Sequence, residues 1–383
     1  MKQKTLFPLS AVVALLLAAC NPQSNSQSTQ MPNKQLPNPQ TQDILSDTEK
    51  SKFAQLTTIG FAHCCVRGEI FTTDLLEDSI RHAATESGVK LLFATAEDSL
   101  NRDDLSVQPR QVKNMIDKGA KAIILISAQG KGAEQMQEEI LEYAKSKGVP
   151  VVAAGRPLSP KLHTHFPDVI SVGSSSEEAG TNQGKMAVDL WHKHPEWDLN
   201  KDGVLQYGLL QGAKDHPQTV ARANYFMKAI TAKGLKSERI ATEHTNWERP
   251  VAQEIVAKWI ATGEINKMEM IVGGSDDLAM GALDAFRDEF RRPVPILGIN
   301  AFDETKRAIK KGNIAGSILQ DIEAQGRVAY KIAENLALDK PATNGINLPL
   351  KTNSINIPYA VVTAENVDEY LKEEKRYGKK QGK

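Results

Sequence analysis

The sequence is poor in cysteine, with 3 residues in a chain of 383, and two of them, Cys64 and Cys65, are neighbours. So few cysteines exclude a disulfide framework, and no Cys-x-x-Cys spacing indicates a zinc site. Adjacent cysteines can close a disulfide only as a strained ring, which is rare in proteins. The pair is therefore compatible either with a vicinal disulfide, in an oxidising compartment, or with two free thiols.

The chain also lacks an excess of charge and the motifs of common enzymes. It carries 47 basic and 47 acidic residues, with a pI near 7.1, and no basic stripe with interleaved aromatic residues. These features argue against a nucleic-acid partner. We find no nucleophile elbow, no His-Glu-x-x-His and no phosphate-binding loop, and Gly130 with Gly132 lacks the third glycine of a dinucleotide motif. We therefore expect binding without turnover, and no enzyme activity.

Long apolar runs are missing except at the N-terminus. Lys2 and Lys4 precede the apolar segment Leu6–Ala19, which is short for a membrane span and ends in Leu-Ala-Ala directly before Cys20. This pattern predicts a lipoprotein signal peptide over residues 1–19 and acylation of Cys20. An ordinary secretory signal that happens to end near a cysteine is the alternative. With no later apolar run of sufficient length, we expect membrane attachment through lipid only, in the periplasm or on the outer cell surface.

A polar low-complexity segment follows the cysteine. In residues 21–42, 19 of 22 positions are Asn, Pro, Gln, Ser or Thr. Such a composition cannot bury enough apolar surface to offset the entropy lost on ordering. The sequence therefore predicts a lipidated cysteine and a disordered tether over residues 20–50.

Oxygen-bearing side chains recur at every second position in one short stretch, which is the beginning of an EF-hand-type calcium loop. A glycine, Gly203, stands at position six, where the loop must turn sharply, but position twelve is Leu209 instead of a bidentate Glu. A calcium site here would need its last carboxylate from elsewhere in the chain, and the alternative is a solvated turn. The proposed ligands in the loop are the side chains of Asp198, Asn200, Asp202 and Gln206 and the carbonyl of Val204.

The remaining chain alternates apolar runs with stretches of helical periodicity, which indicates an α/β fold with parallel sheets. Its length of some 320 residues favours two lobes. The predicted strands are Thr57–Ala62, Lys90–Ala94, Ala122–Ser127, Val149–Ala154, Val169–Val172, Leu205–Leu210, Ile240–Glu243, Met270–Gly274, Val294–Ile299 and Ile314–Leu319. The clearest predicted helices are Leu75–Glu86, Gln111–Lys118, Glu138–Lys147, Thr181–Lys193, Thr219–Lys233 and Val251–Thr262. Ligands of such sheets bind at the carboxyl ends of strands. The isolated His63, His82 and His163 are expected on the surface or in loops.

Four short segments resemble one family: Trp197–Gly203, His216–Pro217, Ala221–Arg222 and Ala279–Ala282. The chain resembles the periplasmic galactose/glucose-binding protein family, the type I solute-binding proteins of ABC transporters, over about residues 57–371. The resemblance implies two Rossmann-like lobes joined by a three-segment hinge, as in periplasmic-binding-protein type I folds. It places the lobes at 56–173 plus 320–356 and at 174–319 plus 357–378.

The resemblance also implies a role and partners. A monomer would capture a sugar-like small molecule between the lobes, which close by a hinge motion. It would pass that ligand to an ABC permease, and a chemoreceptor is a further possible partner. The resemblance completes the metal site too, because Glu269 stands where the family has a remote carboxylate, so that calcium would have a structural role.

Only part of the family's ligand-binding residues is retained in this chain. By resemblance, Phe71 and Trp247 sandwich the sugar ring, with packing in a core as the alternative for each, and His216 and Arg222 donate to the ring. At positions where the family has Asp or Asn, this chain has Glu69, Gly155, Gln218, Ser275, Asn300 and Gln320, and Arg156 replaces a Lys. Because an amide offers one donor and one acceptor where a carboxylate only accepts, these changes favour an altered ligand preference.

Several functions remain open at this point. The first is a lipid-anchored protein that delivers galactose, glucose or a related sugar to an importer. The second is the same scaffold with a sugar derivative, nucleoside-like or signalling ligand, used for sensing. A regulator built on this core is disfavoured, because no helix-turn-helix precedes it.

Overall fold

The computed structural model of the chain describes residues 57–64, 71–95, 105–128, 132–156, 158–289 and 293–371. The predicted signal peptide, Cys20, the tether, Cys65 and Glu69 lie outside these ranges, as does the side chain of Phe71. Within the described ranges, no helix has both the length and the apolar character needed to cross a membrane.

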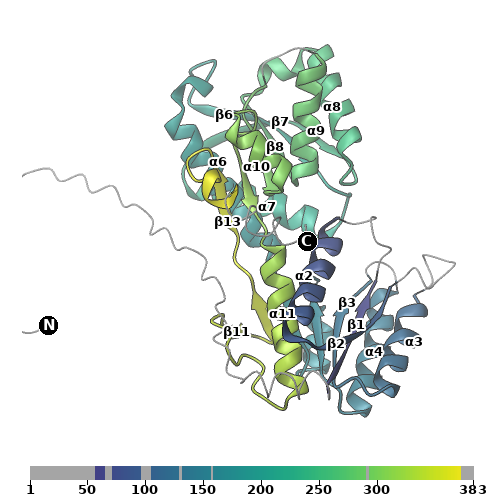
Figure 1. Ribbon diagram of the computed structural model, residues 1–383. Helices are drawn as coiled ribbons and strands as arrows, with labels where there is room; N and C mark the ends of the chain where they lie inside the picture. Colours follow the sequence, from purple (N-terminus) through teal and green to yellow (C-terminus); the bar gives the residue numbers. More distant parts are fainter. Residues whose placement is uncertain are drawn as a thin grey trace, which may run out of the picture. The chain divides into compact units, whose positions relative to one another are not determined.

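The first lobe is built on a seven-stranded sheet with the order β11-β12-β5-β4-β3-β1-β2 (Figure 1). The strands β1 to β5 are parallel, and the two short strands at one edge come from much later in the chain. The strands are β1 (Thr58–His63), β2 (Lys90–Ala94), β3 (Ala122–Ile126), β4 (Val151–Ala154), β5 (Ile170–Gly173), β11 (Leu350–Lys351) and β12 (Ser354–Asn356).

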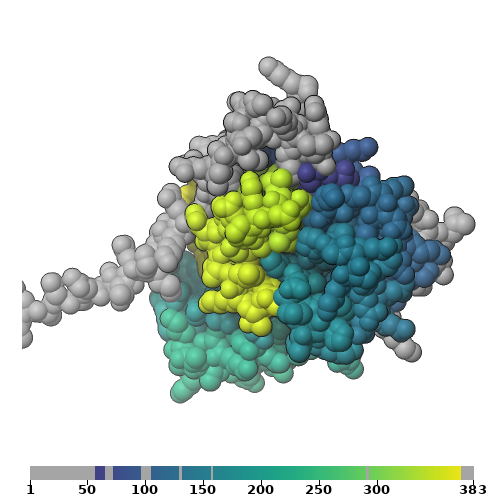
Figure 2. Space-filling view, turned by 90° about the horizontal axis from the view of Figure 1, so that it is seen from below, coloured from purple at the N-terminus to yellow at the C-terminus, as the bar shows by residue number. Residues whose placement is uncertain are grey.

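Helices cover both faces of this sheet. Ile59, Phe61 and Ile124 point to one face and share a core with α2 (Phe71–Ser87) and α11 (Ile322–Ala337). Side chains on the other face pack against α3 (Val107–Asp117), α4 (Ala133–Ser146) and α5 (Pro160–His165). Figure 2 shows the late segment that contains α11, in yellow-green, lying against the blue surface of the first lobe.

The second lobe contains a six-stranded sheet with the order β13-β10-β9-β8-β6-β7. One of its cores lies under α6 and α7 and the other under α8, α9 and α10. The strands are β6 (Val204–Gln211), β7 (Lys236–His244), β8 (Met270–Gly273), β9 (Ile296–Asn300), β10 (Gly316–Leu319) and β13 (Ala360–Thr363). The helices are α6 (Ser176–Lys193), η2 (Pro195–Trp197), α7 (Pro217–Ala232), α8 (Arg249–Ala261), η3 (Glu264–Lys267), α9 (Asp276–Asp288) and α10 (Asp303–Lys310).

The chain passes between the two sheets three times, after β5, after β10 and after β12. Side chains tie the passages to one another. Ser174 donates to the Ile357 carbonyl at 2.8 Å, Gln325 donates to Ser174 at 3.0 Å, and Asn356 donates to Glu178 at 2.7 Å. The prediction of two α/β lobes joined by a three-segment hinge is confirmed.

Two details of the sequence-based picture are wrong. The sheets are not wholly parallel, because β13 runs antiparallel to β10 and β11 antiparallel to β12. The β11–β12 hairpin turns at Thr352 and Asn353, which both have positive φ, at 47° and 58°, as a two-residue hairpin turn requires. His63 is not a surface or loop residue: it ends β1, is fully buried, and its Nδ1 lies 3.6 Å from Glu77 Oε2.

Candidate functional site

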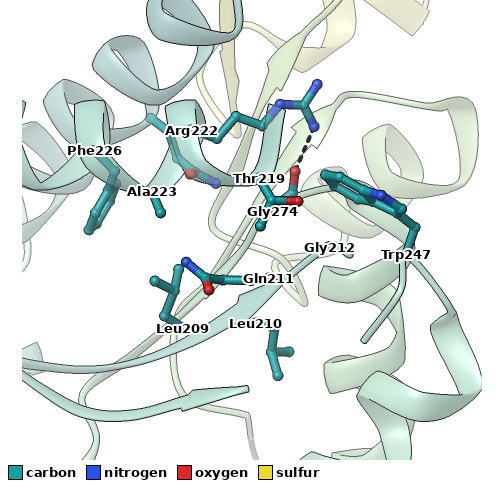
Figure 3. A pocket seen from close by; sticks show the side chains of 11 residues that line it. Leu209, Leu210, Gln211, Gly212, Thr219, Arg222, Ala223, Phe226, Trp247 and Gly274 are labelled. Atoms are coloured by element: carbon teal, nitrogen blue, oxygen red, sulfur yellow. Dashed lines mark hydrogen bonds between the residues drawn. The ribbon is translucent and has the colours of Figure 1, made fainter. Parts of the chain in front are cut away.

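A small pocket lies in the second lobe, where β6 and β8 end and α7 begins (Figure 3). Two of the predicted ligand contacts, Arg222 and Trp247, line it. Three polar lining residues, Gln183, Gln211 and Thr219, were not predicted from the sequence. Gln211 directly follows the predicted strand Leu205–Leu210, and Thr219 directly follows the predicted contact Gln218. The lining consists of Gln183, Leu209, Leu210, Gln211, Gly212, Thr219, Arg222, Ala223, Phe226, Trp247 and Gly274.

Trp247 is held in a strained turn. Asn246 and Trp247 both have positive φ, at 53° and 70°, and the Glu248 amide donates to the Thr245 carbonyl at 2.9 Å across them. Such turns prefer Asn-Gly at their centre, so a tryptophan there costs on the order of 1–3 kcal/mol. Thr245 offsets part of this cost, since its amide and hydroxyl both donate to the Gln211 carbonyl, at 2.9 and 2.8 Å. Strain of this kind typically accompanies a functional position.

The indole of Trp247 lies directly on the backbone of Gly212, as Figure 3 shows. A Cβ atom at Gly212 would be 2.1 Å from Trp247 Cε2, so only glycine leaves room for the ring. The sequence left open whether Trp247 packs in a core or lines a binding site, and in the structure it packs in a core and lines the pocket. Trp247 is half-buried against the core of the second lobe and also forms a wall of the pocket.

His216 and Arg222 complete the cluster around Trp247. The rings of His216 and Trp247 meet edge to face with centroids 6.0 Å apart, and the Arg222 guanidinium carbon lies 5.7 Å from the Trp247 centroid. His216 caps α7, because its Nδ1 accepts from the Gln218 amide at 3.2 Å. The neutral ring therefore carries its hydrogen on Nε2. Burial lowers the pKa of His216, and the charges of Arg156 and Arg222 lower it further, so it is a neutral donor.

Three buried polar groups at this end of the lobe have unused hydrogen-bonding capacity. Arg222 is 6% exposed and donates through Nη1 to the Gly274 carbonyl at 2.7 Å, but its Nε has no partner in the part of the chain that the structure describes. The hydroxyls of Thr219 and Ser275 are likewise buried without a partner. An unsatisfied buried donor costs about 1–3 kcal/mol, so these groups are set to meet water or a ligand.

The pocket by itself is small. The space in which the centre of a water molecule can lie is about 10 Å³, which is enough for about one water molecule. A sugar ring therefore cannot be enclosed by these residues alone. They form a floor on which a ring could rest, with the indole as the flat surface and the donors beside it.

Asn300 and Gln320 lie at the carboxyl ends of β9 and β10 and contact each other, with Asn300 Nδ2 donating to Gln320 Oε1 at 3.0 Å. Asn300 has a φ of 123° and Ala301 a φ of 50°, which are rare values for residues with a side chain. Buried Asp276 holds this turn: its Oδ2 accepts from the Phe302 amide and its Oδ1 from the Ser317 hydroxyl, both at 2.6 Å. Asp276 is thus a positioning residue for Asn300.

The Asp276 carboxyl gives the first testable prediction, a pH dependence of stability. Burial raises its pKa to about 6, from 3.8. Because the pKa of Asp276 is higher in the folded state than in the unfolded state, the protonated carboxyl stabilises the fold fully at a pH below the unfolded-state pKa. This contribution is lost as the pH rises through the folded-state pKa. Between pH 4 and 6.5 the wild type should lose about 2 kcal/mol of unfolding free energy that an Asp276→Asn variant does not lose. Urea unfolding across this range measures the difference.

The control for that experiment is Asp288→Asn, which removes an exposed carboxylate from the end of the same helix. The absolute stability of Asp276→Asn is not the readout, because the amide also alters the bond from Phe302. Parallel pH profiles for the wild type and both variants would contradict a titrating buried carboxyl at this position.

In the first lobe, Arg156 follows β4 directly after Gly155. Its Nη1 donates to the Ser127 carbonyl at 3.2 Å and to Cys64 Sγ at 3.4 Å. The predicted contact residue and the unusual cysteine are therefore neighbours at the carboxyl ends of three strands, β1, β3 and β4.

The calcium-loop residues fold around one another and meet Glu269. Asp198 accepts from the amides of Asp202 and Gly203 at 3.2 and 3.0 Å, and Lys201 and Gly203 adopt positive φ in the tight curl. Glu269, 3% exposed, accepts from the amides of Leu199 at 2.7 Å and Gln206 at 3.2 Å. The sequence-distant carboxylate thus reaches the loop.

The electrostatics of this loop suit a hard cation. Burial raises the pKa of Glu269, the nearby Asp198 adds to that rise, and the buried Oε1 of Gln206 has no hydrogen-bond donor. Oxygen atoms of carboxylates, amides and carbonyls on a curled segment are the ligands that Ca²⁺ prefers. The residues present therefore fit calcium.

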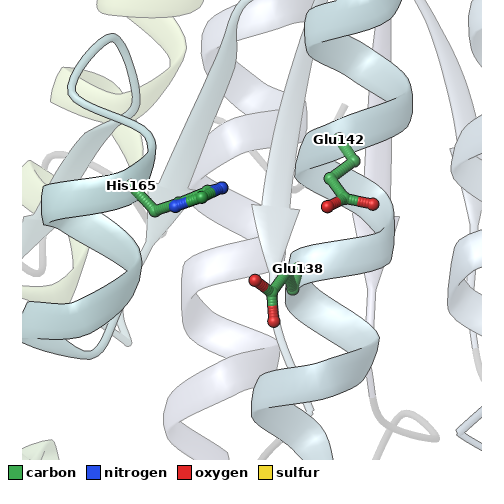
Figure 4. Close-up of side chains that lie close together, drawn as sticks. All are labelled: Glu138, Glu142 and His165. Atoms are coloured by element: carbon green, nitrogen blue, oxygen red, sulfur yellow. The ribbon is translucent and has the colours of Figure 1, made fainter.

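A second group of ligand-type side chains lies on the first lobe, where Glu138 and Glu142 of α4 face His165 of α5 (Figure 4). Glu142 and His165 are exposed, and Lys161 lies 3.8 Å from Glu138. An exposed acidic cluster with a lysine beside it is ordinary solvated surface.

Comparison with known proteins identifies the family. The model of the periplasmic binding protein domain matches residues 66–341. The D-galactose/methyl-galactoside binding periplasmic protein of Haemophilus influenzae is 32% identical over 292 residues, which is 76% of this chain and 85% of that protein. The xylitol-binding protein of Mycolicibacterium smegmatis is 26% identical, over 74% of this chain and 72% of that protein.

Solved structures agree in fold. A solute-binding protein of an Actinobacillus succinogenes ABC transporter, with bound D-allose, superposes with a TM-score of 0.66 at 17% identity, covering 82% of this chain and 100% of that one. A Bacillus halodurans solute-binding protein with bound myo-inositol gives a TM-score of 0.62 at 23% identity, covering 82% and 96%. Proteins of this family are binding components of transport systems without enzymatic activity, so the expectation of binding without turnover is confirmed. The chain belongs to the periplasmic binding protein family, with the type I fold of the sugar-binding components of ABC transporters.

Proposed function

We propose that the protein is an extracytoplasmic receptor that captures a monosaccharide or a closely related polyol and delivers it to an ABC permease. The observation that carries this proposal is the cluster of Trp247, His216 and Arg222 at the carboxyl ends of strands. An indole face suits the C–H face of a sugar ring, while the donors beside it suit hydroxyl oxygens.

The predicted contacts around this cluster extend the proposal. Phe71 would cover the opposite face of the ring from the first lobe. Polar contacts would come from that lobe through Glu69 and Arg156, and from the second lobe and the hinge through Gln218, Ser275, Asn300 and Gln320. The relatives named for galactose and xylitol support this ligand class. The altered edge residues favour a preference different from galactose and glucose.

The experiment that tests the function identifies the bound molecule. The purified protein would be denatured mildly, and the released small molecules analysed by mass spectrometry, followed by calorimetry with the stripped, refolded protein. We expect a sugar or polyol that rebinds with a stoichiometry of one. Release of a molecule that has no sugar-like ring or polyol chain would refute the proposal.

Structural calcium belongs to the same proposal. Asp198, Asn200, Asp202 and Gln206 would supply side-chain oxygens, Val204 its carbonyl, and Glu269 the closing carboxylate. The ion would fix the loop to the start of β8 and β6 and would take no part in ligand chemistry. The meeting of Glu269 with the loop supports this assignment.

A lipid anchor at Cys20 is a further part of the proposal and gives the second prediction. If Cys20 is acylated, Cys20→Ser should release the protein from the membrane fraction or leave its signal peptide uncleaved. Fractionation followed by intact-mass measurement distinguishes these outcomes. Cys64→Ser serves as the matched cysteine variant and should leave fractionation unchanged. A membrane-bound, fully processed Cys20→Ser protein would rule the anchor out.

A further inference from the structure

Two guanidinium groups at the proposed ligand site have no carboxylate partner among the residues that the structure describes. Arg222 is nearly buried, and its acceptors are the Gly274 carbonyl and the phenol of Tyr359. Arg156 is half-buried, and its partners among the described residues are the Ser127 carbonyl and Cys64 Sγ, neither of them a carboxylate. Neither forms a salt bridge with any residue that the structure describes. Charged groups withdrawn from water are normally paired, because an unpaired buried charge is costly.

The neutral groups around Arg222 are donors as well. The buried hydroxyls of Thr219 and Ser275 have no hydrogen-bond partner among the described residues, and His216 presents its Nε2 hydrogen. Ser275 precedes α9 as its N-cap, yet its side chain makes no capping bond, so the hydroxyl remains available. The N-termini of α7 and α9 add positive potential at the same end of the lobe.

The carboxylates of this region are already engaged elsewhere. Asp276 accepts from Ser317 and Phe302, and Asp321 caps α11 by accepting from the Ala324 amide at 2.8 Å. Asp277 lies on the exposed side of α9, where the charge of Arg249 acts on it. Among the described residues, the floor of the site therefore combines positive charge with hydrogen-bond donors and lacks a free negative group.

We propose that the ligand is a sugar acid, a hydroxylated ring or chain that carries a carboxylate, and that this carboxylate pairs with Arg222. The inference rests on the proposed function and narrows its ligand class. A carboxylate accepts bonds from a guanidinium in a fixed geometry, and Arg222 Nε, which has no partner among the described residues, is available to donate one of them. The hydroxyls of Thr219 and Ser275 supply further bonds, the ring rests on Trp247, and Arg156 adds positive charge.

The test compares matched pairs of ligands by calorimetry on the full chain, stripped of bound molecules and kept in calcium. The pairs are D-galactose with D-galacturonate and D-galactonate, D-glucose with D-glucuronate and D-gluconate, and D-xylose with D-xylonate; D-galactose 6-phosphate represents a phosphate. We expect the best acid to bind at least 30-fold more tightly than its neutral parent. Raising the salt concentration from 50 to 500 mM should weaken binding of the acid more than that of the parent sugar.

Variants assign the effect to the guanidinium. Arg222→Gln should reduce the ratio of acid to neutral affinity at least tenfold, and Arg222→Lys, which keeps the charge without the fork, should restore part of that ratio. Arg239→Gln removes an exposed arginine from the edge strand β7 and should leave the ratio unchanged. An unchanged ratio in Arg222→Gln would overturn the assignment to Arg222.

The outcomes separate this inference from the proposed function. If a neutral sugar binds as tightly as its acid, the protein is still a sugar receptor and the inference is wrong. Tightest binding of the phosphate would equally overturn the carboxylate. If none of the compounds binds and the released molecule is unrelated to sugars, the proposed function fails and the inference fails with it.

Discussion

Removal of calcium with a chelator is expected to lower the melting temperature of the protein by about 5–10 °C. A ligand that binds only the folded state stabilises it by about 2.7 kcal/mol at a hundredfold excess over its dissociation constant. In a folding unit of about 150–250 residues, which is the size of the second lobe, each kcal/mol shifts the melting temperature by about 2–4 °C. Without a cation the loop is also destabilised by charge repulsion, because Asp198, Asp202 and Glu269 place three carboxyl groups close together.

Glu269→Gln should abolish most of the response to chelator. The amide keeps the size of the side chain but removes the charge that would close the coordination sphere. Glu243→Gln, which removes an exposed glutamate from β7, is the matched control and should respond to chelator like the wild type. Differential scanning calorimetry of each protein with calcium and with excess chelator gives the curves needed. If the two curves of the wild type coincide, the loop is a solvated turn and the metal assignment is wrong.

The sequence predicted the architecture of the lobes well because the central strands leave a strong signal. Ile123 to Ile126 and Met270 to Val272 are continuous apolar runs between turns, and both became fully buried parallel strands. Each of the ten predicted strands overlaps an observed one. The strands β11, β12 and β13, which lie at or next to a sheet edge, left no comparable signal, since they are two to four residues long and partly exposed. Their antiparallel pairing depends on the hinge and on one hairpin turn, which periodicity does not encode.

The candidate site was predictable only where a local pattern marked it. The oxygen spacing from Asp198 to Gln206 is such a pattern, whereas Glu269 lies 63 residues beyond Gln206 and could be assigned only through family resemblance. Thr219 was overlooked because a threonine inside a predicted helix usually faces solvent or packs. Its importance comes from the close approach of Arg222 and Trp247, a feature of tertiary structure. The burial of His63 was missed for the same reason, because one histidine at the end of a strand has no periodicity.

Trp247→Ala is expected to weaken ligand binding at least 30-fold. Aromatic anchors in binding sites typically contribute about 2 kcal/mol or more when truncated, and 2 kcal/mol corresponds to about 30-fold in affinity. The structure gives a reason to expect the full effect here. The chain maintains a strained turn at Asn246 and Trp247 and reserves the space over Gly212 for the indole, which stability alone would not require. Calorimetry with the co-purified ligand measures the loss.

Two further variants serve as controls for this experiment. Trp247→Phe keeps an aromatic face and should recover a large part of the affinity, since the contact depends on a flat ring more than on the indole N–H. Trp197→Ala removes a different tryptophan, which stacks on His194 with centroids 4.5 Å apart outside the pocket, and should leave affinity unchanged at saturating calcium. Equal binding by the wild type and Trp247→Ala would mean that the ligand does not rest on this ring. The strained turn would then require another explanation, and the binding site would have to be sought away from the carboxyl ends of β6 and β8.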